Sequence, residues 1–403
     1  MTEQLSEERR QQVLDLCRDL IRIRSYSGEE EKVVERLKEF YTACGFDEVR
    51  TDEYGNLTAI INGNRPGPTI LFDAHMDTVP VQDPESWKHD PFGAQIEDGM
   101  LYGRGTTDMK CALACMATAA GFFARDTGRD FAGRVAVAGI VHEECFEGIA
   151  SRAVSRDLKP DLVVIGEASE LKLKIGQRGR AEILLETYGV PAHSSNPEKG
   201  VNAAYAMCRA VERIHAMAPS VHEFLGKGIL ELTDIKSLPY PGKSVVPEYC
   251  SATYDRRLLV GETKESVLAP IRRILEELHE EDPSFKGNVS YASGEETCYT
   301  GEKIRAERYF PAWLLERDHP AVQRVMEGFR SHGYEPEITK YSFCTNGSHY
   351  CGEAGIPCLG MGPSRENIAH TIDEYVPVEE LYAAAQIYEW MMEAFLCKTD
   401  KLS

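Results

Sequence analysis

The sequence predicts an α/β protein with two domains. Strands and helices alternate over the first 179 residues and again after residue 294, which indicates a layered α/β domain. Between these segments the order becomes strand, helix, strand, strand, helix, strand, which is the ferredoxin-like arrangement. The chain has 403 residues, enough for each domain to bury its own core. We therefore expect a discontinuous first domain, residues 1–179 and 295–403, and an inserted second domain, residues 180–294.

Hydrophobic periodicity places the elements of the first domain. Apolar residues recur at helical spacing near the start of the chain, and Ser27 followed by Glu30 has the form of a capping box. A run rich in glycine and proline, residues 63–68, predicts a turn between the first two strands. The expected elements are helices over 6–24, from 27 onward and over 109–125, strands over 57–62, 69–73, 134–141 and 161–166, and closing helices over 319–331 and 378–395.

The order of the predicted strands and helices changes near Gly179, where the second domain should begin. Its expected elements are a strand over 181–188, a helix over 201–217, strands over 228–237 and 248–258, a helix over 264–280 and a strand over 288–292. Residues 294–305 have the composition of a linker that returns to the first domain.

The charge balance limits the partners. With 45 Lys and Arg against 65 Asp and Glu, the net charge is −20. This excess of acid argues against nucleic acid or an anionic membrane as the main partner. The longest apolar run, Cys111 to Ala124, is too short to span a bilayer, and the first residues lack a signal peptide. The 12 cysteines are scattered and form no Cys-x-x-Cys pair, so we expect reduced thiols in a cytoplasmic protein.

Imidazole and carboxylate groups follow several of the predicted strands. His75 and Asp77 end the strand at 69–73; they are two residues apart and can share a face. A carboxylate commonly holds the second ring nitrogen of a metal-bound histidine, and Asp77 is placed to do so. Read alone, this pair also suits a solvated loop histidine beside an aspartate that caps a helix.

Four more groups repeat this pattern. Asp108 follows a glycine-rich turn that leads into a helix, where it could also be an ordinary N-cap. The pair Glu143 and Glu144 ends an apolar strand, and two acids there are costly to bury unless positive charge is near. Glu167 ends another apolar strand, and His370 lies in a polar loop near the C-terminus.

Together these groups predict a metal site. Open α/β sheets place their ligands at the carboxyl ends of strands. Oxygen donors with two imidazoles suit Zn²⁺, Co²⁺ or Mn²⁺ better than a metal that prefers thiolates. There is no His-Glu-x-x-His, no P-loop and no Gly-x-Gly-x-x-Gly, which excludes a zincin, a P-loop enzyme and a dinucleotide site of that type.

The ordered motifs resemble those of the dinuclear-zinc amidohydrolases and peptidases, which include acetylornithine deacetylase, succinyl-diaminopimelate desuccinylase, aminoacylase and glutamate-type carboxypeptidases. The resemblance runs from residues 21–29 to the last histidine. It implies two Zn²⁺ per subunit, with Co²⁺ or Mn²⁺ as alternatives, and Asp108 as the bridging ligand. The implied metal ligands are His75, Asp108, Glu144, Glu167 and His370, and the implied catalytic residues are the general base Glu143 and the supporting Asp77.

The second domain resembles the lid of the same family. The segment 188–203 resembles the lid motif, in which a histidine, here His193, helps to hold the oxyanion, often across a dimer. Asp255-Arg256-Arg257 resembles an Asp-x-Arg motif whose arginine, here Arg257, binds a substrate carboxylate. Considered alone, these are a loop histidine and a surface ion pair.

Departures from the family pattern affect the substrate rather than the metal site. His142 stands where an aspartate usually precedes the glutamate pair, and Ser244 stands where the lid usually has asparagine. Residues 343–349 occupy the position where the family usually has Gly-Thr-Asp. We expect Thr345 and Asn346 in this run to contact substrate. This run and the segment 309–313 are most similar to a subfamily linked to selenium metabolism, whose label does not define a substrate.

These observations predict a metal-dependent hydrolase of a linear amide C–N bond. The expected substrate is a small N-acyl or N-carbamoyl amino acid with a carboxylate. A dipeptidase or carboxypeptidase on the same scaffold is one alternative. A metal-binding protein without activity is another, which the general base Glu143 argues against, since storage would not require it. We also expect a homodimer joined through residues 180–294.

Overall fold

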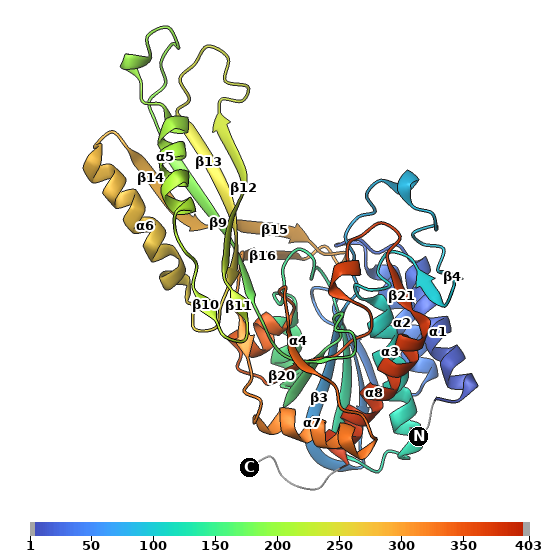
Figure 1. The fold of residues 1–403 in the computed structure, drawn as a ribbon. Coiled ribbons are helices and arrows are strands. Elements are labelled where there is room, and N and C mark those ends of the chain that lie inside the picture. Colours follow the sequence, from blue (N-terminus) through green and yellow to red (C-terminus); the bar gives the residue numbers. More distant parts are fainter. Residues whose placement is uncertain (1–4, 398–403) are drawn as a thin grey trace. The chain divides into compact units, whose positions relative to one another are not determined.

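The structure is a computed structural model that describes residues 5–397 (Figure 1). The chain divides into two compact units. Unit 1 takes in the chain up to Gln177, Glu295–Ile304 and the chain from Leu314 onward. Unit 2 takes in Arg178–Gly294 and Arg305–Trp313. Residues 305–313, expected in the first domain, therefore belong to unit 2, because the strand at Tyr309–Phe310 pairs within its sheet.

Unit 1 is built on a central mixed sheet. Along this sheet the strands follow the order β1-β2-β6-β3-β7-β20-β8, and β19 pairs with β8. The middle strands β6, β3, β7 and β20 are parallel neighbours, whereas β1, β2 and β8 pair antiparallel. The bounds are β1 (Glu48–Thr51), β2 (Leu57–Asn62), β3 (Arg65–His75), β6 (Ala132–Ile140), β7 (Leu162–Ile165), β8 (Leu173–Gln177), β19 (Ile338–Tyr341) and β20 (Cys358–Gly360).

Helices cover this sheet (Figure 1). In unit 1, α3 and α8 contact both β3 and β6, α1 packs against both of these helices, and α7 packs against α8. Helix α3 is rich in alanine and cysteine and is buried nearly all round, so small side chains let it approach the sheet closely. The helices are α1 (Glu7–Arg22), α2 (Glu31–Ala43), α3 (Lys110–Asp126), α4 (Ser151–Leu158), α7 (Pro320–Ser331) and α8 (Val378–Leu396).

Three local expectations for unit 1 were wrong. Ser27 does not cap α2; its hydroxyl donates to Asp77 Oδ2 instead, over 2.6 Å. The turn expected over 63–68 is largely strand, since β3 begins at Arg65. The linker expected over 294–305 contains two paired strands, β15 (Ser293–Thr297) and β16 (Lys303–Glu307). The short strands β4 (Gln95–Glu97), β5 (Met100–Tyr102) and β21 (Tyr375–Pro377) form a separate small sheet that periodicity did not predict.

Unit 2 has the predicted order of its main strands and helices, with a short strand pair that was not predicted, β10 (Val221–His222) and β11 (Gly226–Lys227), between α5 and β12. Its antiparallel sheet runs β12-β13-β9-β14, and α5 and α6 cover one face. Burial alternates along β9 and β13, so one set of side chains enters the core beneath the helices and the other set faces away. The elements are β9 (Gly179–Tyr188), α5 (Ala203–His215), β12 (Ile229–Leu238), β13 (Tyr249–Leu258), α6 (Lys264–Glu281) and β14 (Lys286–Tyr291), with β17 (Tyr309–Phe310) added beside β9.

Two further features, the length of the helices and the state of the cysteines, can be stated for residues 5–397. None of the helices within residues 5–397 combines the length and apolar character that crossing a membrane requires. All 12 cysteines lie in this range, and they form no disulfide bond with one another.

Candidate metal centre

Three neighbouring parallel strands of unit 1 deliver acids and an imidazole to one edge of the sheet. His75 is the last residue of β3, and it pairs in register with Ile140 at the end of β6. The pair Glu143 and Glu144 follows β6, and Glu167 follows β7. Because these strands are parallel, their carboxyl ends lie together, which brings the side chains to one place.

Two more groups complete the cluster from loops. Asp108 stands two residues before the first residue of α3, at the end of a turn with two left-handed glycines, Gly103 and Gly105. His370 follows the short helix η4 (Glu366–Ile368) and itself has a positive φ of 63°. The structure thus brings together all five residues that the sequence suggested as metal ligands.

The five residues form two groups that share Asp108. His75, Asp108 and Glu167 offer ligand atoms close enough to hold one ion, as do Asp108, Glu144 and His370. His75 Nε2 lies 2.8 Å from Asp108 Oδ1 and 3.5 Å from Glu167 Oε1. His370 Nε2 lies 3.1 Å from both Asp108 Oδ2 and Glu144 Oε2. Each oxygen of Asp108 therefore faces a different imidazole, which is the arrangement of a carboxylate between two ions.

The electrostatics of the cluster favour cations. Burial raises the pKa of Glu144 and Glu167 to about 7, and the charge of Asp108 adds to this. Hydrogen bonding to Asp108 and Glu144 raises the pKa of His370 to about 10. Four carboxylates converge here, those of Asp108, Glu143, Glu144 and Glu167, so two divalent cations would balance their charge. The donor set of imidazole nitrogens and carboxylate oxygens fits such ions.

Glu143 lies beside the cluster without completing either group. It is 5% exposed, and its Oε2 lies 3.9 Å from His75 Nε2. Its Oε1 is buried and has no hydrogen-bond partner among the described residues. Burial raises the pKa of Glu143 well above its ordinary value. A buried carboxylate oxygen with no partner suits a proton acceptor that faces a bound water.

Asp77 supports the cluster in a way that differs from the prediction. The His75 Nδ1–H donates to the backbone carbonyl of Asp77 over 2.8 Å, whereas Asp77 Oδ1 is 3.6 Å away. The Asp77 carboxylate instead accepts the backbone N–H groups of Glu143 and Glu144, over 3.1 and 3.2 Å. Because the carbonyl accepts a hydrogen bond from Nδ1, the lone pair of a neutral His75 lies on Nε2, where a metal would need it.

Glu374 supports the cluster and was missed in the sequence. It is fully buried, and its carboxylate accepts the backbone N–H groups of Gly105, Thr107 and Asp108 over 2.8–3.2 Å. Arg104 Nη1 donates to it over 2.6 Å. Glu374 thereby fixes the turn that presents Asp108. No local pattern reveals this, because Glu374 lies 266 residues from Asp108 along the chain.

Thr345 and Asn346 are interior residues with their side chains engaged. The Thr345 hydroxyl donates to Gln177 Oε1 over 2.6 Å. The Asn346 side chain donates to Asp73 Oδ1 over 2.9 Å and accepts from the Gly148 N–H over 2.8 Å. The expectation that these two side chains contact substrate is therefore not supported, because both are buried and already bonded.

The other two predicted substrate residues lie in unit 2. His193 is exposed, and its Nδ1 accepts hydrogen bonds from the N–H and hydroxyl of Ser195. Arg257 is on the face of the sheet away from α5 and α6, where its Nε donates to Asp255 Oδ1 over 2.7 Å. Arg180, opposite Arg257 on β9, donates to the other oxygen of Asp255. Two guanidinium groups thus flank one carboxylate.

Comparisons with known proteins identify the family of this chain. Residues 71–394 match the model of peptidase family M20/M25/M40. Uncharacterized protein YgeY of Escherichia coli K12 is 34% identical over 92% of this chain and 91% of its own length. Succinyl-diaminopimelate desuccinylase 2 of Ruegeria sp. (strain TM1040) is 31% identical over 99% of each chain. The structure of the Bacillus subtilis YXEP protein, described as a dinuclear metal binding peptidase, superposes with a TM-score of 0.70, at 14% identity over 96% of this chain and 98% of that one.

The matched region contains every residue of the metal cluster, and the relatives are covered over nearly their full length. The chain is therefore a member of peptidase family M20/M25/M40, a metal-dependent hydrolase that acts on amide bonds.

Proposed function

We propose that this protein hydrolyses the linear amide C–N bond of an N-acyl or N-carbamoyl amino acid. The observation that carries the proposal is the pair of ligand groups that share Asp108, with the unpartnered Oε1 of Glu143 beside them. We assign His75, Asp108 and Glu167 to one Zn²⁺ and Asp108, Glu144 and His370 to the other. Two such ions, when bound, would polarise the amide carbonyl and lower the pKa of a water molecule.

Glu143 is the proton carrier in this proposal. Its carboxylate takes a proton from the attacking water and then delivers it to the nitrogen of the leaving amine, so that the C–N bond breaks without release of a strong base. Asp77 keeps Glu143 and Glu144 in place through their backbone N–H groups. These bonds fix the main chain from which the Glu143 side chain extends, which favours one reactive geometry.

The substrate carboxylate is assigned to Arg257. A guanidinium group binds a carboxylate through two parallel hydrogen bonds, and Arg180 adds positive charge next to it. This assignment favours amino acids that carry an acyl or carbamoyl group on nitrogen and keep a free carboxylate. The desuccinylase relative acts on a substrate of the N-acyl kind, as its name states, which supports the same class.

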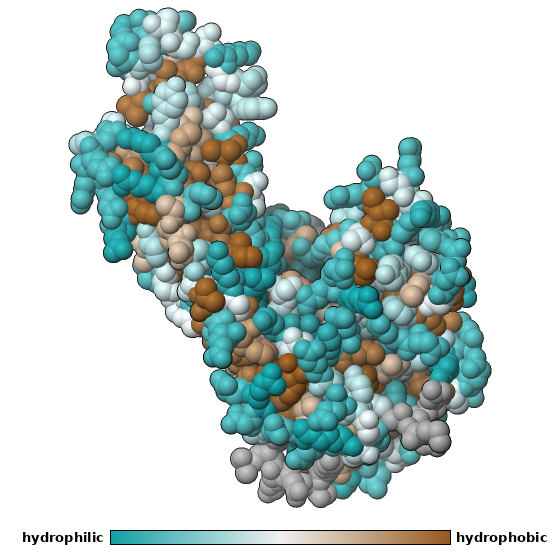
Figure 2. Space-filling model, viewed as in Figure 1, coloured by the Kyte–Doolittle hydropathy of each residue, from teal (hydrophilic) through white to brown (hydrophobic). Residues whose placement is uncertain are grey.

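His193 is assigned to the oxyanion that forms when water adds to the carbonyl. This role requires unit 2 to approach the metal centre of its own subunit or of a partner. We propose a homodimer joined through unit 2. Its edge strand β12 is paired on one side only among the described residues, and exposed apolar side chains lie on it and nearby: Ile229, Ile235, Leu238, Tyr240 and Val245. Figure 2 shows such apolar patches among the hydrophilic surface of this unit. We also propose a cytoplasmic location, since the cysteines within residues 5–397 form no disulfide bond with one another.

A peptidase reaction remains the second candidate, because the YXEP structure is described as a peptidase. The experiment is a rate comparison of the zinc-loaded protein on N-acyl amino acids, N-carbamoyl amino acids and dipeptides. We expect the highest kcat/KM on one of the first two classes, and methyl esterification of the carboxylate should lower it. Clear preference for dipeptides, or equal rates on acids and esters, would contradict the proposed substrate.

The same assay tests Glu143. Glu143→Gln keeps the size of the side chain and removes the proton acceptor, so kcat should fall by about 10²–10⁴-fold while the zinc content stays the same. The matched control is Glu170→Gln, an exposed glutamate three residues beyond Glu167, which should keep the wild-type rate. Near-full turnover by Glu143→Gln would remove Glu143 as the base.

A further inference from the structure

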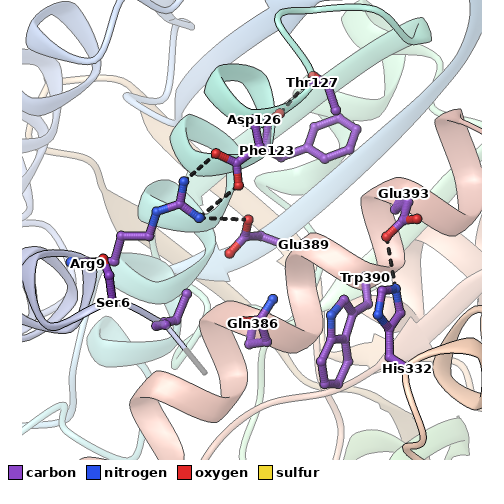
Figure 3. A pocket seen from close by; sticks show the side chains of 11 residues that line it. Ser6, Arg9, Phe123, Asp126, Thr127, His332, Gln386, Glu389, Trp390 and Glu393 are labelled. Atoms are coloured by element: carbon purple, nitrogen blue, oxygen red, sulfur yellow. Dashed lines mark hydrogen bonds and ion pairs between the residues drawn. The ribbon is translucent and has the colours of Figure 1, made fainter. Parts of the chain in front are cut away.

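A cavity of about 470 Å³ lies in unit 1 at the end of α3 remote from the metal centre (Figure 3). Asp108 precedes α3 and Asp126 is its last residue. Since an α-helix rises about 1.5 Å per residue, roughly 25 Å separate these two aspartates. The cavity is formed by the start of α1 and the C-terminal ends of α3 and α8, together with His332 beyond α7. It is therefore distinct from the hydrolytic site.

The cavity contains a buried carboxylate with one oxygen that accepts no hydrogen bond from the described residues. Glu389 on α8 lines the cavity and is only 7% exposed. Its Oε1 has no hydrogen-bond partner among residues 5–397, and its Oε2 lies 3.7 Å from Arg9 Nη1, too far for a hydrogen bond. Arg9 is instead bonded to Asp126 through both of its terminal nitrogens. Figure 3 shows Asp126 and Glu389 on the same guanidinium group.

Two aromatic side chains, His332 and Trp390, line the same cavity as Glu389. The rings of His332 and Trp390 are stacked, with centroids 4.8 Å apart and planes 9° from parallel. His332 Nε2 lies 2.9 Å from Glu393 Oε2, which holds the imidazole in place. An indole face next to carboxylates is a favourable environment for a cation that carries apolar groups, because the ring and the acids both attract positive charge.

The charges around the cavity do not balance. Asp126, Glu389 and Glu393 provide three acidic groups, whereas the basic groups in the lining are Arg9, bonded to Asp126, and His332, bonded to Glu393. Glu389 is thus the acid of the lining that has no hydrogen-bonded basic partner. These acids do not form a metal cluster either, since the groups of described side chains that could share an ion are those of the hydrolytic site. The single acid without a basic partner, Glu389, thus favours an organic cation that carries one positive charge.

We propose that this cavity binds a small organic ammonium ion. The ammonium group donates to Oε1 of Glu389, and its apolar stem packs against Trp390. A volume of about 470 Å³ accommodates a molecule of roughly amino-acid to dipeptide size. Burial raises the pKa of Glu389 to about 8, and Asp126 adds to this effect while Arg9 opposes it, so a bound cation would restore the charged carboxylate that burial disfavours.

To test this proposal, the full-length protein is titrated with n-butylammonium chloride at constant ionic strength. Binding is followed by NMR of ¹⁵N-labelled tryptophan indole groups, and the Trp390 signal is assigned with Trp390→Phe. We expect a saturable shift of the Trp390 signal, whereas the neutral analogue 1-butanol should bind at least tenfold more weakly. Glu389→Gln should weaken binding of n-butylammonium at least tenfold.

The matched control is Glu327→Gln, an exposed glutamate on α7 outside the cavity, which should leave binding unchanged. Trp390→Leu gives an independent test: it keeps Glu389 and should weaken binding several-fold by removing the aromatic face. Equal affinity for 1-butanol, binding that Glu389→Gln leaves unchanged, or no saturable shift at tens of millimolar ligand would each overturn the proposal. The second outcome would place the amine elsewhere, for example at the metals.

Discussion

The backbone N–H of Ser195 donates a hydrogen bond to Nδ1 of His193 over 3.1 Å. A backbone N–H is always a donor, so Nδ1 must be the unprotonated nitrogen of the neutral ring. The remaining proton is then on Nε2. This tautomer is the one that can donate to an oxyanion, and it is set within the loop of unit 2 before any substrate arrives.

The first prediction concerns this histidine. His193→Ala should lower kcat by about 10²–10³-fold, the usual effect of removing one oxyanion donor, with a smaller change in KM. Ser195→Ala keeps the backbone N–H and should retain most of the rate. The ¹⁵N chemical shifts of the His193 ring should report the Nε2–H tautomer. A ring protonated on Nδ1, or a His193→Ala variant affected in KM alone, would contradict the assignment.

The second prediction concerns the proposed dimer. If His193 acts on the site of the partner subunit, a mixture of His193→Ala and Glu143→Gln proteins should regain activity after subunit exchange, because one hybrid site then carries both groups. Random exchange makes half of the dimers hybrid, each with one competent site, so about a quarter of the wild-type rate is expected. The readout is activity before and after exchange, with exchange followed by mass spectrometry of differently tagged chains. Proven exchange without regained activity would show that His193 does not act in trans.

The third prediction concerns Glu374, which holds the turn around Asp108. Glu374→Gln places an amide where three backbone N–H groups and Arg104 need an acceptor, so Asp108 should be less well ordered. We expect metal affinity to fall by about 10–100-fold, as is usual for groups that support metal ligands. The measurement is competition of the metal-free protein with a chromophoric chelator. Glu379→Gln, an exposed change on α8, is the control, and equal affinities would contradict the predicted role.

The fourth prediction concerns pH and Glu389. Its pKa rises from an ordinary 4.5 to about 8 on folding, so the folded state binds more protons between these values. The stabilisation it provides is therefore complete below the unfolded pKa and is lost as the pH rises through about 8. When the pKa of a group differs by one between the folded and unfolded states, the free energy of unfolding changes by up to about 1.4 kcal/mol.

Glu389→Gln cannot ionise and should not show this loss. Its free energy of unfolding relative to wild type should increase between about pH 5 and about pH 9, as measured by urea denaturation at both values. Glu327→Gln, which is exposed, should change little with pH relative to wild type. A constant difference between Glu389→Gln and wild type would show that this carboxyl group does not titrate as described.

Much of the fold was predictable because its signals are local. The strands β2, β3, β6 and β7 contain apolar runs, α1 has buried residues at helical spacing, and α3 and α8 are long segments rich in apolar residues. Along β9 and β13, more buried and less buried side chains alternate, which indicates a sheet that is covered on one face. The short strands β4, β5 and β20 each have three residues, too few for a period to appear in the sequence.

The candidate site was predictable where the residues follow strands and match family motifs, as His75, Glu143, Glu144 and Glu167 do. The supporting bonds were not, because they join distant parts of the chain. Ser27 has the form of a helix cap but bonds to Asp77, 50 residues away. Thr345 and Asn346 have polar side chains in a loop-like run, yet their partners Gln177 and Asp73 lie in the interior. Such hydrogen-bonded pairs form only in the tertiary fold, so no local sequence pattern predicts them.

Asp108 has one oxygen close to each imidazole, so under the proposed assignment the two ion sites would not fill independently. The first ion to bind would order this carboxylate for the second and would also neutralise part of its charge. Whichever effect is larger, the change in affinity is the same in both directions, since linked equilibria are reciprocal. A substitution that weakens one site, such as a change at His370, should therefore alter the apparent affinity of the site at His75. The protein should accordingly be described by a stepwise pair of binding constants rather than by a single metal stoichiometry.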